Sequence, residues 1–252
     1  LVESGHREMV LTGSDMGHYG RDRVPPTTLA ALLARVMEVP GLRRLRLSSV
    51  LPPYFTEELI RVVSGSRLLC PHLHIPLQSG SDRVLRLMRR PYNTAIYISL
   101  VERLSKAMPD LGLGADVIAG FPGESEADFE ETVGLIEALP FSYLHVFSYS
   151  DRKGTEAARL PDHLPPRVIT QRSKALRDLG RAKNLAFRRT LLGRTLEVLV
   201  LETREKGTGL LTGLTGNYVE LLFSGPDSLM GQLAKVTITD VEAERALGKL
   251  VP

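Results

Sequence analysis

His72 and His74 are separated by one residue in the segment LLCPHLHIPLQ (68–78), which has the composition of a strand. Side chains two positions apart in a strand lie on the same face, so the two imidazoles could bind one metal ion. A zinc site needs at least three protein ligands, and the sequence places no third candidate beside them. We therefore predict no metal site and interpret His72, His74 and His145 as strand histidines.

A polar turn, QSGSDRV (78–84), follows this strand and opens a helix-like run. Gly80 permits unusual backbone angles, and Ser79 or Ser81 could cap the helix. Free N–H groups at such a turn suit an anion or a carboxylate, although a capped turn without any ligand is an equal alternative. The segment DVIAGFPGES (116–125) allows the same two interpretations.

Cys70 is the only cysteine of the 252 residues. Disulfides within the chain and metal sites built from several cysteines are therefore excluded. We interpret Cys70 as a small buried residue.

The positive charge is concentrated in residues 163–194, which hold nine basic residues and one acidic residue, although the whole chain has a net charge of only +3. The segment from Pro165 to Leu192 is predicted to be one long helix. A basic helix is often only a solvated surface, but this asymmetry favours contact with a polyanion, mainly through phosphates.

Strand-like and helix-like segments alternate through the first 150 residues, which predicts βα units around a parallel sheet. The polar and glycine-rich clusters follow the strands, where (β/α) barrels and open parallel sheets both build their sites. Beyond residue 192 short strands occur without helices, which predicts a small antiparallel β-barrel. The predicted parts are residues 1–162, a partial barrel; 163–192, a basic linking helix; and 193–252, a β domain.

Several motifs, in this order along the chain, together resemble the methylthiotransferase family of radical S-adenosylmethionine enzymes. They are LTGSDMGHYGRD, RLSS, HLHIPLQSGSDRVLRLMRRPY, ADVIAGFPGESEADFEET and FSYLHVFSYSDRKGTEAA, and the C-terminal module resembles a TRAM domain. The resemblance implies a partial radical-SAM barrel followed by an RNA-binding TRAM-like domain. CPHLHIPLQSG and LHVFSYSDRKGT look most like the branch that methylthiolates N6-threonylcarbamoyladenosine in tRNA. The alternatives are methylthiolation of isopentenyladenosine in tRNA, modification of an aspartate in a ribosomal protein, or a cluster-free RNA-binding protein.

The resemblance implies a transferase that uses S-adenosylmethionine and two [4Fe-4S] clusters. In such enzymes one cluster cleaves S-adenosylmethionine to form a radical that abstracts hydrogen, and the other carries the transferred sulfur. The cysteines that bind both clusters are absent from this chain, and the opening LVESGHREMVLTG resembles the middle of a longer protein. We expect an N-terminal half to be missing, and this chain alone to ligate neither cluster and to be inactive.

The resemblance also implies roles for individual residues. Asp116 would lie near the substrate adenosine as the catalytic candidate. Contacts to S-adenosylmethionine would come from Thr12, Gly13, Ser49, Gln78, Ser79, Arg90, Ile118, Gly120, Phe147 and Tyr149, with Arg90 assigned to the carboxylate. The tRNA would be held by the TRAM-like module and by Arg177, Arg181, Arg188 and Arg189.

The implied partners are the anticodon loop of tRNA, the missing half of the protein and an electron donor protein. No apolar run approaches the length of a membrane span, and no signal peptide is recognisable. We therefore expect a cytoplasmic protein without a membrane partner.

Overall fold

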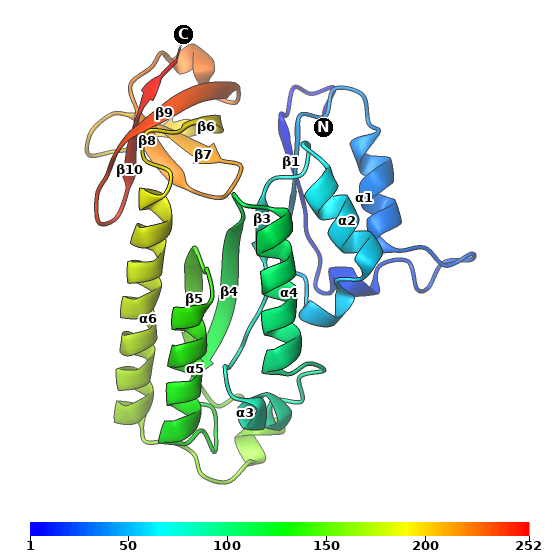
Figure 1. The fold of residues 1–252 in the computed structure, drawn as a ribbon, viewed down its shortest axis with the longest axis vertical. Coiled ribbons are helices and arrows are strands. Elements are labelled where there is room, and N and C mark those ends of the chain that lie inside the picture. The colour runs from blue at the N-terminus through cyan, green and yellow to red at the C-terminus, as the bar shows by residue number, and fades with distance from the viewer. Residues whose placement is uncertain (252) are drawn as a thin grey trace.

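A computed structural model describes residues 1–251, which form two β-rich parts joined by one long helix (Figure 1). The strands of the first part are β1 (Glu8–Leu11), β2 (Arg44–Leu47), β3 (His72–His74), β4 (Gly112–Ala119) and β5 (Tyr143–Ser148). All their pairings are parallel. β1 pairs with β2 in one sheet, and β4 pairs with both β3 and β5 in another. Isolated parallel bridges from Leu45 to Leu69 and from Ser49 to His74 join the two groups. The result is a curved wall, the predicted partial barrel.

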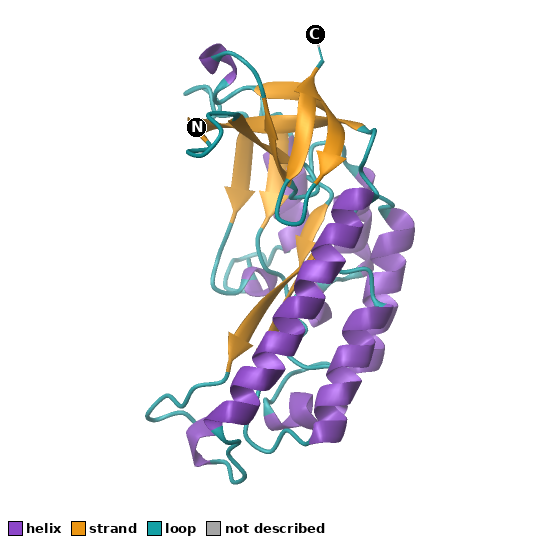
Figure 2. Cartoon of the chain, turned by 90° about the vertical axis from the view of Figure 1, so that its left-hand side faces the viewer, coloured by secondary structure: helices purple, strands orange, loops and turns teal. Residues whose placement is uncertain are grey.

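Helices follow the strands and lie mainly on one side of the wall, whereas the other side faces the interior (Figure 2). They are α1 (Leu29–Met37), α2 (Glu57–Gly65), α3 (Asp82–Leu87), α4 (Thr94–Ala107) and α5 (Glu126–Ala138). Side chains at Thr28, Thr56 and Asn93 accept a backbone N–H bond three residues on, which explains where α1, α2 and α4 begin. The predicted capping box of Ser125 and Asp128 starts α5.

The two faces of the strands differ in chemistry. One face carries Leu45, Leu47 and Leu73, which are buried beneath the helices. Tyr97 of α4 is fully buried in the same core and donates its hydroxyl to the carbonyl of Ile75 at 2.7 Å. Because side chains alternate along a strand, polar residues such as Arg46 lie on the opposite, interior face.

The long helix α6 (Pro166–Arg189) packs along β5 and β4 and leads into the second part (Figure 1). That part is a closed barrel of β6 (Thr195–Arg204), β7 (Leu211–Thr215), β8 (Glu220–Phe223), β9 (Leu233–Val241) and β10 (Ala246–Leu250). Its strands surround a second apolar core that includes Val198, Phe223 and Val236. The expected antiparallel pairing holds for most pairs, but β10 and β8 run parallel, because β10 closes the barrel after returning from β9.

Single-turn 3-10 helices lie in the connections, at Met16–His18, Pro52–Tyr54, Ala157–Arg159 and Asp227–Leu229. None of the helices within residues 1–251 combines the length and the apolar character that crossing a membrane requires.

The small barrel covers the amino ends of the parallel strands (Figure 2). The turn between β7 and β8 contacts the start of β4, where a Cβ atom on Gly112 would lie 2.1 Å from the carbonyl oxygen of Asn217. A larger residue at position 112 would push the two parts of the molecule apart, so glycine is required for this close approach.

Candidate cofactor site at the carboxyl ends of the parallel strands

The carboxyl ends of the five strands form one edge of the wall, opposite the small barrel (Figure 1). Thr12 and Gly13 follow β1 and are exposed, and Ser49 follows β2. Ile118 on β4 is the direct register partner of Phe147 on β5, whose side chain is 53% exposed. The structure thus brings these predicted residues to one edge.

Gln78 continues the line of β3 and adopts a backbone conformation that is rare outside glycine. Its φ of 67° is held by two backbone bonds to β4, from its N–H to the Asp116 carbonyl at 2.8 Å and from Ile118 N–H to its own carbonyl at 2.9 Å. The residue is buried, and within residues 1–251 its backbone, not its side-chain amide, makes the hydrogen bonds. A strained residue with an uncommitted amide at a strand end is typical of a ligand site.

Arg90 lies between α3 and α4 and supplies an uncommitted positive charge. Its Nε is buried and has no hydrogen-bond partner among residues 1–251. Leaving a buried donor unpaired costs about 1–3 kcal/mol, a cost that an anionic ligand would remove. Arg90 therefore fits the predicted carboxylate contact.

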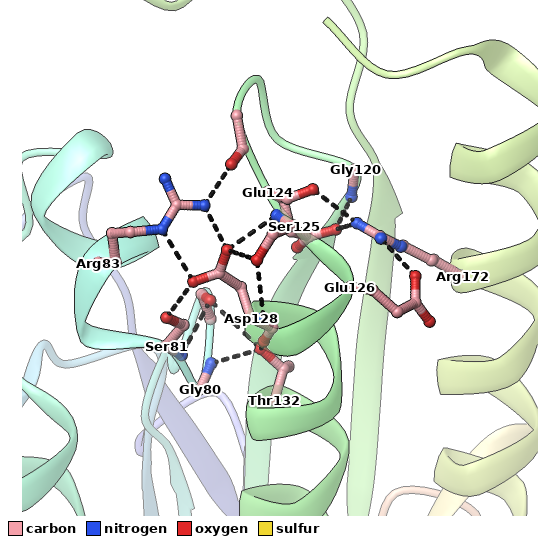
Figure 3. Close-up of polar contacts among 12 residues, drawn as sticks. Gly80, Ser81, Arg83, Gly120, Glu124, Ser125, Glu126, Asp128, Thr132 and Arg172 are labelled. Carbon is pink, nitrogen blue, oxygen red and sulfur yellow. Dashed lines mark hydrogen bonds and ion pairs between the residues drawn. The ribbon is translucent and has the colours of Figure 1, made fainter. Parts of the chain in front are cut away.

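The turn at residues 79–81 uses its polar groups internally (Figure 3). Ser79 is fully buried, with its hydroxyl 3.3 Å from that of Thr132, and it accepts a bond from the Ser81 N–H. The Gly80 N–H donates to Thr132 at 2.9 Å. The hydroxyl predicted to contact a ligand at Ser79 is therefore occupied within the protein. The alternative of a capped turn is not met either, because Ser81 stands at the N-cap of α3 but donates its hydroxyl to Asp128 and makes no capping bond.

Asp128 at the start of α5 is the centre of the same network (Figure 3). It accepts hydrogen bonds from Ser81 at 2.7 Å and from both Arg83 and the Ser125 backbone. Burial opposes its ionisation, but the bonds from Arg83, Ser125 and Ser81 outweigh burial and lower the pKa of Asp128. This carboxylate ties the turn after β3 to the helix after β4.

Gly120 packs closely against the long helix, and its predicted contact with an adenine stays a prediction. Its N–H donates to Glu124 at 2.9 Å, and an added Cβ would lie 2.6 Å from Ile169 of α6. Glu124 also pairs with buried Arg172 of α6 at 2.8 Å (Figure 3). Burial raises the pKa of Glu124 despite this partner. The long helix is therefore anchored to the loop after β4.

Tyr149 and Phe147 stay near the edge but differ in environment. The Tyr149 hydroxyl donates to Asp151 at 2.9 Å, and its ring lies edge-to-face against Phe121 with centroids 5.4 Å apart. Phe147 is the more accessible of the two predicted aromatic contacts.

Asp116 lies deeper on the interior face, between two histidines. His74 Nε2 is 3.0 Å and His145 Nδ1 is 3.4 Å from the same Asp116 oxygen. Burial would raise the pKa of Asp116, but its hydrogen bonds with His74 and His145 outweigh burial and lower it. Sequence reasoning missed this cluster because it depends on the register that pairs Asp116 with His145.

His72 takes no part in that cluster, although it precedes His74 by two residues. Its Nε2 lies 2.8 Å from the Tyr143 hydroxyl, and its ring stacks on Tyr218 of the small barrel with centroids 4.3 Å apart. Burial lowers the pKa of His72 to about 3, so the ring is neutral at pH 7. His72 is therefore a buried strand histidine, although its Nδ1 has no hydrogen-bond partner among residues 1–251.

The basic residues of α6 do not form one continuous surface. Arg177, Arg181 and Arg189 are exposed, although Arg181 pairs with Asp178. Arg188 is buried and donates to the carbonyl of Ala243 in the small barrel, so it is not available to an external partner.

Cys70 lies at the amino end of β3, far along the strand from Gln78, and burial raises the pKa of its thiol. An iron–sulfur cluster needs several thiolates, and this chain offers a single buried thiol at the wrong end of the strands. The residues of this chain therefore do not fit an iron–sulfur cluster.

Two family models match the chain in the order that the fold shows. Residues 3–136 match the Radical SAM superfamily and residues 189–251 match the TRAM domain. The chain belongs to the radical SAM superfamily and carries a TRAM domain. Coproporphyrinogen III oxidase from Escherichia coli, described as a radical SAM enzyme, has a similar fold, with a TM-score of 0.51 and 15% identity over 76% of this chain and 51% of its own.

Curated relatives with higher identity carry one name, "tRNA-2-methylthio-N(6)-dimethylallyladenosine synthase". The protein from Moorella thermoacetica is 39% identical over 251 residues, which is 100% of this chain and 56% of the relative. The protein from Desulfitobacterium hafniense is 36% identical over 99% of this chain and 56% of its own length. The chain thus spans about half the length of the curated relatives it matches. Their name corresponds to our isopentenyladenosine alternative and does not support the threonylcarbamoyladenosine prediction.

Proposed function

We propose that this chain is the barrel and RNA-binding part of a tRNA methylthiotransferase that acts on N6-dimethylallyladenosine. One observation carries the proposal, namely that a radical SAM wall and a TRAM domain occur together in a chain up to 39% identical to relatives of that name. The threonylcarbamoyladenosine branch, favoured by the resemblance of the motifs alone, has no such relative among these proteins.

The carboxyl edge of the wall supports S-adenosylmethionine as the small ligand. Arg90 would bind the carboxylate, because its guanidinium has a buried donor that meets no partner in the described part of the chain. Gln78 and Ile118 would contact the rest of the molecule from neighbouring strands, together with Thr12, Gly13, Ser49 and Phe147. When bound in radical SAM enzymes, S-adenosylmethionine supplies a radical, and these residues would orient it and exclude water.

Asp116 would face the substrate from the interior wall, held as a carboxylate by the histidines on either side. We further propose that both iron–sulfur clusters and the electron donor are engaged by protein outside these residues. This chain alone would then be inactive, and the whole protein would act on tRNA in the cytoplasm.

Contact with tRNA would come from the TRAM domain and from the exposed arginines of α6, namely Arg177, Arg181 and Arg189. Changing all three to glutamine is expected to weaken tRNA binding and to flatten its salt dependence, by about 0.7–0.9 in log–log slope for each phosphate that is no longer neutralised. Arg167→Gln, at the opposite end of α6, is the matched control, because it removes one exposed charge of the same helix. A salt slope that the triple change leaves unaltered would remove α6 from the tRNA surface.

The proposed reaction is tested by nucleoside analysis of tRNA from a strain that lacks the gene. Loss of 2-methylthio-N6-dimethylallyladenosine, with accumulation of the unmethylthiolated nucleoside, is the expected result. Loss of the threonylcarbamoyl counterpart instead would restore the other branch. Unchanged levels of both would reject a tRNA methylthiotransferase.

A further inference from the structure

His74, Asp116 and His145 come from three neighbouring strands and meet on the interior face of the wall. Their ligand atoms all lie within 4.8 Å of one another. We propose that these three side chains bind one divalent first-row transition-metal ion of the Zn²⁺ type. The proposal goes beyond the tRNA modification proposed above and does not depend on it.

The distances fit a shared ion. Zinc binds imidazole nitrogen at about 2.0–2.1 Å and carboxylate oxygen at about 2.0–2.2 Å, so two ligands at tetrahedral angles lie about 3.3–3.5 Å apart. The Asp116 oxygen is 3.4 Å from His145 Nδ1 and 3.0 Å from His74 Nε2. The two histidine nitrogens lie within 4.8 Å of each other, so side-chain rotation that brings them to tetrahedral spacing would place one ion in contact with all three atoms.

The surroundings of His74 prepare its Nε2 for a metal. The other ring nitrogen, Nδ1, lies 3.1 Å from the Tyr143 hydroxyl, which in turn lies 2.8 Å from His72 Nε2. With an ion on Nε2, Nδ1–H of His74 donates to Tyr143, and the Tyr143 hydroxyl donates to His72. Such a partner on the free nitrogen is the usual arrangement behind a metal-binding histidine, and here it also fixes the ring orientation.

Glycine makes room for this support. A Cβ on Gly114 would lie 2.0 Å from the ring of Tyr143, so any larger residue would displace the tyrosine from beneath His74. The strand β4 thus provides the ligand Asp116 and, at Gly114, the space for the Tyr143 side chain that supports His74.

Charge and access are also suitable. One carboxylate and two imidazoles leave a divalent ion with net positive charge, typical of sites that hold a further water or an oxygen or nitrogen donor. The side chains are 10%, 24% and 56% exposed for His74, Asp116 and His145, so the ion can enter from the His145 side. With three protein ligands, the fourth position would stay open to a molecule in the interior.

The test is equilibrium dialysis of the chelator-treated 252-residue chain against micromolar Zn²⁺, with metal content measured by mass spectrometry. We expect one Zn²⁺ per chain. Tyr143→Phe removes the partner behind a metal ligand and should weaken Zn²⁺ binding by about 10- to 100-fold. Asp116→Asn and His145→Asn each remove a metal ligand itself and should weaken Zn²⁺ binding by more than this. Long-range proton–nitrogen spectra should show zinc on Nε2 of His74 and on Nδ1 of His145.

Two variants serve as matched controls. His163→Asn removes a histidine that lies 3.3 Å from Asp151 and has no third ligand among residues 1–251, and Cys70→Ser removes the thiol. Both should retain full binding. Circular dichroism verifies the fold of each variant, and His145 is exposed enough that its replacement should not unfold the chain.

Absence of Zn²⁺ uptake by the unaltered chain would overturn the proposal. Uptake that survives both Asp116→Asn and His145→Asn would overturn it as well, and the three side chains would then form only a hydrogen-bonded cluster. Because the readout is metal content, failure here would leave the nucleoside analysis of the proposed function unaffected.

Discussion

The two ends of the parallel strands place polar residues in opposite situations. At the amino ends, Glu8 pairs with both Arg44 and Arg46, at 2.9 and 2.8 Å, and all three are almost fully buried. Carbonyls of the β7–β8 hairpin at Leu214, Thr215 and Gly216 accept further bonds from the two arginines. At the carboxyl ends, the Arg90 side chain has neither an ion pair nor a hydrogen bond among residues 1–251, and its Nε is buried.

This difference indicates that the amino ends of the strands contribute to stability and the carboxyl ends to ligand binding. The buried arginines at the amino ends share a carboxylate and so hold two parts of the molecule together, although Arg44 Nε itself has no partner among residues 1–251. A guanidinium without any ion pair at a strand end costs free energy unless a ligand satisfies it. In (β/α) barrels the amino face contributes mainly to stability and the carboxyl face carries the chemistry. Each of the following changes tests one side of that contrast.

Glu8→Gln is expected to have the largest effect, because it leaves two buried guanidinium groups without their carboxylate. Removing one partner of a buried ion pair costs about 3–5 kcal/mol of the free energy of unfolding. Urea unfolding measures this loss. Glu57→Gln is the control, since its ion pair with Arg103 is exposed on the surface and should contribute less than about 1 kcal/mol. Equal losses in the two variants would contradict the role given to the amino ends.

Arg90→Gln should have the opposite profile, with weaker ligand binding and unchanged stability. A hydrogen bond to a charged group contributes about 1.5–3 kcal/mol, so the affinity for S-adenosylmethionine should fall by about 10- to 150-fold. Calorimetric titration measures the affinity. Arg86→Gln, on the exposed side of α3, should leave affinity unchanged. Loss of stability without loss of affinity would place Arg90 among the structural residues.

His72 should make stability depend on pH. Its pKa is lowered to about 3 in the folded chain, against about 6.5 in the unfolded chain, so the unfolded state binds more protons between these values. Stability is therefore lost as pH falls below about 6.5. Between pH 7 and 5 the loss from His72 amounts to about 2 kcal/mol. Urea unfolding of the unaltered chain and of His72→Gln at pH 7 and pH 5 measures this loss of stability. The variant should lose about 2 kcal/mol less than the unaltered chain between the two pH values, and an identical loss would refute the lowered pKa of His72.

Tyr218→Ala should have the smallest effect of the four. Tyr218 stacks on His72, and the Arg46 guanidinium lies 5.1 Å from its ring centre, but its side chain remains 44% exposed. Aromatic pairs contribute about 0.5–1.5 kcal/mol, and we expect a loss in this range. Thermal unfolding followed at two wavelengths measures it. Tyr218→Phe retains the ring and is the control. If Tyr218→Ala lost more free energy of unfolding than Glu8→Gln, our ranking of the two contacts would be reversed.

The sequence predicted the element order well. Alternating strand and helix patterns indicated the five parallel strands, and the capping box at Ser125 and Asp128 marked the start of α5. These features depend on local periodicity and backbone capping, which involve residues close together in the chain. For the same reason the sequence indicated that polar groups collect after each strand, and that the last 60 residues or so form a separate β domain.

The roles of single side chains were less accessible to sequence analysis. Ser79, Gly120 and Arg188 have suitable types and positions, but the fold uses them internally, at Thr132, Ile169 and Ala243 respectively. A basic side chain on α6 can lie toward solvent or toward the small barrel, and charge counts do not distinguish the two.

By itself, the sequence determined the class of fold, the order of its parts and the absence of cysteines for an iron–sulfur cluster. Only the tertiary structure decided that His74 lies beside Asp116 and His145, while His72 lies beside Tyr143 and Tyr218. The physical reason is that register between strands depends on packing across the whole wall. A shift of one residue would place every side chain of a strand on its other face, and no local pattern specifies which partner each histidine meets.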